Sequence, residues 1–107
     1  YTADDVESTG MIEILKEALE WLDCSQIYFS LDMDAIDPAY APGLGTPEPF
    51  GLSARDVRTA VRTLAPFSMA LDIVEIAPEY DSGQAAMLGA KLMREFIASH
   101  ANSCRKM

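Results

Sequence analysis

Two short apolar segments constrain the fold of this chain more than any other feature. Residues 27–31 (IYFSL) and 69–76 (MALDIVEI) are rich in branched and aromatic side chains, and they predict strands that are covered on both faces. An amphipathic helical segment lies between them. Two strands joined through a helix pair in parallel with a right-handed crossover. The sequence therefore predicts an α/β fold built on a parallel sheet.

Amphipathic segments before, between and after the strands predict the element order α–β–α–β–α. They cover residues 2–22 with an interruption at Gly10, residues 53–65, and about residues 82–100. Thr2 and Ser53 each precede an aspartate by three positions, which is the spacing of a helix capping box. Prolines and glycines are dense between residues 37 and 51, so this segment is expected to be a loop.

Two strands alone leave both edges of a sheet open and cannot bury two apolar faces. We therefore expect the sheet to have further strands. On this basis residues 1–107 are interpreted as the C-terminal part of a single larger domain whose N-terminal part is absent.

The charge balance limits the classes of partner. Acidic residues outnumber basic ones 17 to 8, and the net charge of −9 argues against nucleic acid or an anionic membrane surface as partner. A small cationic substrate would suit this charge, although acidity also serves solubility. No charged and apolar leader opens the sequence and no apolar run is long enough to cross a bilayer, so we expect a cytoplasmic protein.

Asp32 and Asp34 follow the first predicted strand and are the first candidate site residues. If the strand continues through them, both carboxylates point to one side at its carboxyl end, where α/β sheets bind ligands. Two like charges so close favour a cation between them, and hard oxygen ligands suit manganese, magnesium or calcium. An Asp-x-Asp pair alone is more often a solvated acidic turn.

Two other kinds of site share a strand followed by Asp-x-Asp, and both fit less well. Phosphatases of the haloacid dehalogenase type have a Gly-Thr turn after the second aspartate, where this chain has Ala35 and Ile36. Such an enzyme would require magnesium and a phosphorylated Asp32. A calcium loop would need glycine at its sixth position, which is occupied by Asp37.

Several separate blocks resemble the ureohydrolase family, which includes arginases and agmatinases. Residues 30–38 (SLDMDAIDP), 41–43 (APG) and 45–47 (GTP) are similar to the signature of this family. Residues 71–78 (LDIVEIAP) resemble its last strand near the active site. The blocks occur in the expected order and span nearly the whole chain. The resemblance implies the C-terminal portion of an arginase-like three-layer α/β/α fold with a parallel sheet.

The resemblance also implies roles for individual residues. Asp32 would bridge two manganese ions, and Asp34 would bind one of them. Glu75 would hold the guanidinium group of the substrate by accepting two parallel N–H bonds; without the resemblance it would be an ordinary salt-bridge partner at the end of a strand. Asp72 is interpreted as a buried, structural hydrogen-bonding residue. No residue of this chain is assigned a catalytic role beyond these.

The implied activity is metal-assisted hydrolysis of a guanidino group to urea and an amine. Residues 38–43 and 75–81 look more like agmatinases than arginases, so the expected reaction is that of agmatine to putrescine, a step of polyamine biosynthesis. Arginase, guanidinobutyrase and formiminoglutamase are the alternatives within the family. Family members are commonly trimers or hexamers, so a homo-oligomer is expected.

The chain also departs from the family pattern. The other metal ligands of the family come from a histidine and an Asp-x-His-x-Asp segment, and neither occurs here. The one histidine, His100, is expected to be exposed or to contact the end of the last helix. We therefore expect this chain alone to bind manganese weakly or not at all and to be inactive. A non-catalytic assembly module is the alternative of another class.

Overall fold

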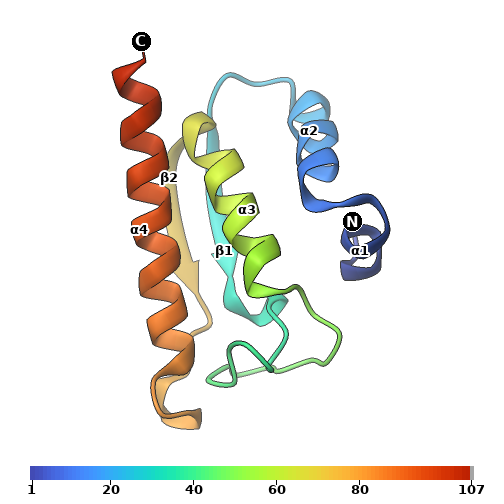
Figure 1. Ribbon diagram of the computed structural model, residues 1–107, viewed down its shortest axis with the longest axis vertical. Helices are drawn as coiled ribbons and strands as arrows, with labels where there is room; N and C mark the ends of the chain where they lie inside the picture. The colour runs from blue at the N-terminus through green and yellow to red at the C-terminus, as the bar shows by residue number, and fades with distance from the viewer. Residues whose placement is uncertain (107) are drawn as a thin grey trace.

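Two parallel strands form the centre of the fold, and helices lie on one face of the sheet (Figure 1). The computed structural model describes residues 1–106. The predicted order is confirmed, with the first helical segment divided in two. The elements are α1 (Ala3–Thr9), α2 (Met11–Leu22), β1 (Ile27–Asp32), η1 (Met33–Ala35), α3 (Ala54–Leu64), η2 (Ala65–Phe67), β2 (Ser68–Val74), η3 (Pro78–Tyr80) and α4 (Gln84–Arg105), where η denotes a 3₁₀ helix.

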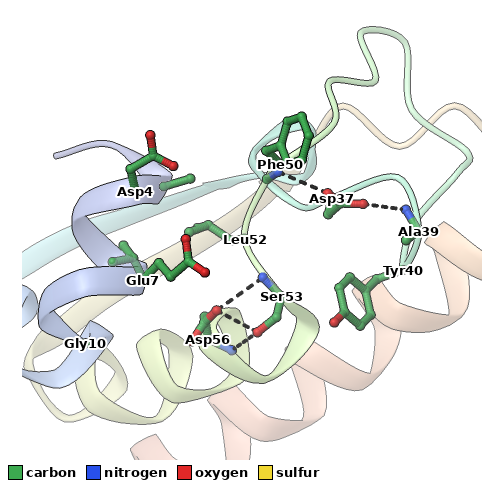
Figure 2. A pocket seen from close by; sticks show the side chains of 13 residues that line it. Asp4, Glu7, Gly10, Asp37, Ala39, Tyr40, Phe50, Leu52, Ser53 and Asp56 are labelled. Carbon is green, nitrogen blue, oxygen red and sulfur yellow. Dashed lines mark hydrogen bonds between the residues drawn. The ribbon is translucent and has the colours of Figure 1, made fainter.

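The helix starts follow the predicted capping chemistry. At α3 the Ser53 hydroxyl oxygen accepts a hydrogen bond from the backbone N–H of Asp56 at 3.0 Å, and the Asp56 carboxylate accepts one from the Ser53 N–H at 3.2 Å (Figure 2). Thr2 and Asp5 form the same arrangement at α1. Each box satisfies backbone N–H groups that the first turn leaves unpaired. Between α1 and α2, Gly10 has a φ of +94°, a conformation that favours glycine and that separates the two helices.

The hydrophobic core lies between the sheet and the pair α3 and α4, which cross the same face in Figure 1. Leu31 of β1 is buried, and Phe29, Leu71 and Ile73 pack against the same core from the two strands. The largest fully buried side chains come from the helices, the turn after β1 and the loop that follows it: Met33, Ile36, Leu44, Val57, Val61 and Leu92. A smaller cluster fixes α1 and α2 against α3.

The other face of the sheet is open, whereas the sequence predicted that both faces are covered. On this face β1 exposes the side chains that alternate with its core residues: Tyr28, Ser30 and Asp32. In β2, Asp72 is half-buried and Val74 is exposed on the same face. Residues 1–106 therefore supply a sheet and one helical layer of the expected three-layer arrangement. None of the helices within these residues has the length and apolarity that a membrane span requires.

Asp81 ties the long loop to the start of α4, and its role was not anticipated. Its carboxylate accepts hydrogen bonds from the backbone N–H groups of Gly83 at 2.8 Å and Ala85 at 2.9 Å. These N–H donors, Ala85 first, hold the pKa of Asp81 below its usual value, and the Gly43 N–H adds to the effect. A Cβ atom at Gly43 would lie 2.3 Å from an Asp81 oxygen, so this close approach requires glycine.

This arrangement predicts how the stability depends on pH. Because the pKa of Asp81 is lowered on folding, its contribution is complete above the unfolded-state pKa of about 3.9 and is lost as the pH falls through the folded-state value. Asp81→Asn should therefore flatten the decline in the free energy of unfolding below about pH 4. Urea unfolding at a series of pH values measures this. Glu79→Gln, which removes a charge but none of these hydrogen bonds, is the control and should keep the decline.

Candidate functional site

The carboxyl ends of β1 and β2 bring the three predicted site residues to one edge of the sheet. Asp32 is the last residue of β1 and is the register partner of Val74, the last residue of β2. Glu75 follows directly, and Asp34 lies in the turn after β1. Parallel strands end on the same side, so acidic residues that lie far apart in the sequence meet here.

Asp34 reaches this edge in a different way from the one predicted. The strand does not continue through it, because β1 ends at Asp32 and Met33–Ala35 form a 3₁₀ turn. Asp32 caps that turn, and one of its carboxylate oxygens accepts the Asp34 backbone N–H at 2.9 Å. Met33 is fully buried and anchors the turn in the core. The alternation argument for Asp34 was therefore wrong, although the residue stays beside Asp32.

The loop after this turn folds back onto the end of β2. The Ala77 N–H donates to the Gly43 carbonyl at 2.8 Å, and Leu44 forms an isolated antiparallel bridge with Ile76. These contacts hold Gly45 beside Glu75: a Cβ atom at Gly45 would lie 3.8 Å from a Glu75 carboxylate oxygen.

The next residue of the loop contacts the other side of the site. The Thr46 backbone N–H donates to an Asp34 carboxylate oxygen at 3.4 Å. Residues 43–46 thus connect Glu75 on one strand end with Asp34 on the other.

Glu75 has a left-handed backbone conformation, with φ at +67°. For a residue with a Cβ atom this costs on the order of 1–2 kcal/mol, and such conformations cluster at functional sites. Its side chain is exposed. Within residues 1–106 the ion pairs are Lys16–Glu13 and Arg62–Glu95, so Glu75 is not the salt-bridge partner of a described residue. Among the described residues, no partner supports the ordinary structural alternative for Glu75.

Two other residues that the sequence singled out have structural roles. The Asp37 carboxylate accepts the N–H groups of Ala39 at 2.8 Å and Gly51 at 3.1 Å and thereby closes the loop (Figure 2). His100 is half-buried, not exposed: its Nδ1 lies 3.0 Å from the Ala65 carbonyl oxygen and its ring stacks on Phe96. The contact is made with the C-terminal end of α3, whose C-cap residue is Ala65, and not with the end of α4.

A hollow of about 710 Å³ lies between α1 and the loop (Figure 2). Asp4 and Glu7 line it, together with Tyr40 and Phe50. Asp32, Asp34 and Glu75 do not contribute to it. The candidate site is therefore an open edge of the sheet, separate from this hollow.

The donor chemistry at the strand ends fits a hard divalent cation. Asp32 and Asp34 each use one carboxylate oxygen in a backbone hydrogen bond, which leaves the other oxygen of each side chain available. Carboxylate oxygens are preferred by manganese and magnesium. No group of three or more histidine, cysteine, aspartate or glutamate residues capable of holding a metal forms in the described part of the chain. Further ligands would have to be water or groups outside it.

Comparisons with known proteins identify the family of the chain. The family model described as the arginase family matches residues 1–99. The mitochondrial guanidino acid hydrolase of Homo sapiens is 37% identical over 99 residues, covering 91% of this chain and 28% of that protein. The mitochondrial agmatinase of Gallus gallus is 36% identical over 97 residues, covering 89% of this chain and 28% of that protein.

Solved structures share the fold. The agmatine ureohydrolase of Thermoplasma volcanium superimposes with a TM-score of 0.90 at 43% identity, covering 97% of this chain and 35% of that one. The arginase of Bacillus subtilis gives a TM-score of 0.84 at 30% identity, covering 90% and 36%. The chain thus spans about a third of the length of these relatives. Because the family model covers nearly all of it, the chain belongs to the arginase family.

Proposed function

We propose that the full-length natural polypeptide carrying these residues is a binuclear manganese hydrolase that cleaves a guanidino group to urea and an amine. The observation that supports this most directly is the meeting of Asp32, Asp34 and Glu75 at the carboxyl ends of two parallel strands, in a chain of the arginase family. Residues 1–107 would be the C-terminal part of a single hydrolase domain and inactive alone, since they offer only two metal ligands.

Asp32 and Asp34 would hold the metal ions through their free carboxylate oxygens. The backbone N–H bonds to their other oxygens fix the orientation of both side chains. The ions, when bound, would supply a water nucleophile of lowered pKa.

Glu75 would hold the substrate cation. Its carboxylate is exposed and can accept two parallel N–H bonds from a planar guanidinium group. Gly45 has no side chain to occupy the space beside this carboxylate. The guanidinium carbon would thereby be held next to the metal ligands, and such positioning is a large part of catalysis in general.

Agmatine is the substrate that we propose first. The similarity to the agmatine ureohydrolase of Thermoplasma volcanium and to the agmatinase of Gallus gallus supports it. Arginases of Arabidopsis thaliana and Oryza sativa subsp. indica are 45% and 46% identical over a shorter stretch of 74 residues, so arginine remains an alternative, as do guanidinobutyrate and formiminoglutamate.

Assembly and location are further proposals. A trimer or hexamer is proposed from the arginase family alone, because the open edges of β1 and β2 would pair with the further strands expected in the full-length polypeptide. A non-catalytic assembly module is the second candidate, because the described residues contain an incomplete metal site.

The cytoplasmic location stays a prediction, because several relatives are named as mitochondrial proteins.

Urea release tests the activity and the substrate together. We expect the full-length natural polypeptide, supplied with manganese, to release urea from agmatine faster than from arginine or guanidinobutyrate, and to release little glutamate from formiminoglutamate. The 107-residue chain assayed beside it should be inactive. Equal activity of this chain would contradict the incomplete site. Turnover of none of these substrates would favour the assembly module.

The metal ligands are tested by Asp32→Asn and Asp34→Asn in the full-length polypeptide. Each change removes a charged oxygen ligand, so manganese affinity and urea release should fall by about 100-fold or more. Manganese titration followed by electron paramagnetic resonance measures the affinity directly. Asp23→Asn is the matched control, because Asp23 is an exposed residue at the end of α2, remote from the strand ends, and asparagine tolerates its left-handed φ of 44°. Near-normal manganese binding in both site variants would refute the assignment.

Glu75→Gln separates substrate binding from metal binding. Glutamine keeps the shape of the side chain but loses the charge, so kcat/KM should fall by about 100-fold while manganese affinity stays at the wild-type level. Steady-state kinetics at saturating manganese provides the measurement. An unchanged kcat/KM would show that Glu75 does not hold the guanidinium group.

A further inference from the structure

A hydrogen-bonded cluster occupies the open face of the sheet, next to the candidate metal ligands. The Tyr28 hydroxyl donates to one carboxylate oxygen of Asp72, and the Ser30 hydroxyl donates to the other at 2.7 Å. Tyr28 and Ser30 are two positions apart in β1, so both point to the same face. Asp72 is not the fully buried residue that the sequence suggested, because this face lacks a covering layer within residues 1–106.

The strand register places this cluster one row before Asp32, on the same face of the sheet. Ser30 pairs with Asp72, and the next pair on the same face is Asp32 with Val74. One such step is about 7 Å along the strand direction. The Asp72 carboxylate therefore lies one row before the strand ends, on the face toward which Asp32 points.

Asp72 carries a negative charge that no cation offsets among the described residues. Its two donors are neutral hydroxyl groups, and neither ion pair within residues 1–106 includes it. Hydrogen bonds from Tyr28 and then Ser30 hold the pKa of Asp72 below its usual value, so the carboxylate is ionised. Because each oxygen is already held by a hydroxyl, the side chain is fixed in its row instead of turning toward the strand ends.

We propose that Asp72 is a positioning residue of the metal site: a fixed negative charge behind Asp32, locked by Tyr28 and Ser30, that strengthens cation binding without being a ligand. This inference rests on the proposed function, since it requires a cation at Asp32 and Asp34. The charge attracts a divalent cation over the short separation between the two rows. The two hydroxyl donors keep Asp72 from coordinating the ion itself and from disturbing the geometry that Asp32 and Asp34 provide.

Manganese titration of the full-length polypeptide tests this role. Asp72→Asn keeps the size of the side chain but removes the charge, so the Kd for manganese should rise about 10-fold, as expected for a group next to the ligands. Excess manganese should then restore kcat and KM to near wild-type values, which it would not do for a merely structural defect. Asp72→Glu retains the charge and should keep the Kd within about threefold of wild type. An equal loss in both variants would overturn the charge argument.

The controls separate this inference from the proposed function. If the wild-type polypeptide binds no manganese, or if Asp32→Asn leaves the Kd for manganese unchanged, both the proposed function and this inference are refuted. If Asp32→Asn weakens binding but Asp72→Asn has the wild-type Kd, the proposed function stands and the role of Asp72 is refuted. Should Asp72→Asn not fold, Ser30→Ala removes one of the two donors; its Kd should rise about threefold, and an unchanged value overturns the inference.

Discussion

The parallel pairing of β1 with β2 is the constraint on which the rest of the molecule depends. It is held from one side only: Leu31 and its apolar neighbours in both strands pack against α3 and α4. The same pairing that buries these side chains aligns Asp32 with Val74 and so brings two acidic strand ends together. A slip of one residue in either strand would turn the polar side chains of that strand into the core. The burial of the apolar side chains therefore also fixes the register that aligns the candidate site residues.

The loop from residue 37 to residue 51 adds backbone contacts to the candidate site. Asp37 closes it by binding two of its N–H groups, and Asp81 anchors Gly43 to the start of α4. These two carboxylates have no expected role in the chemistry of the site, and they hold the backbone of the loop at Ala39, Gly43 and Gly51. Asp32 and Asp34 also accept backbone N–H groups, so this kind of hydrogen bond does not separate the candidate site residues from Asp37 and Asp81.

The sequence predicted what local chemistry determines and missed what tertiary contacts determine. Element order followed from periodicity, and the capping boxes at Thr2 and Ser53 followed from hydroxyl and carboxylate spacing. The end of β1 did not, because Asp32 caps a 3₁₀ turn that depends on burial of Met33. The half-buried position of His100 was equally hidden, since its partner Ala65 is distant in the sequence.

The backbone conformation of Glu75 has an energetic cost. Next to the bridge between Leu44 and Ile76, this residue is left-handed, a conformation that glycine or asparagine would adopt with less strain. Replacement by glycine or asparagine would relieve this strain and stabilise the fold, but it would also remove the carboxylate. With the role in substrate binding proposed for Glu75, stability and activity make opposite demands at this position, so a relative no longer selected for activity would be expected to lose the glutamate early.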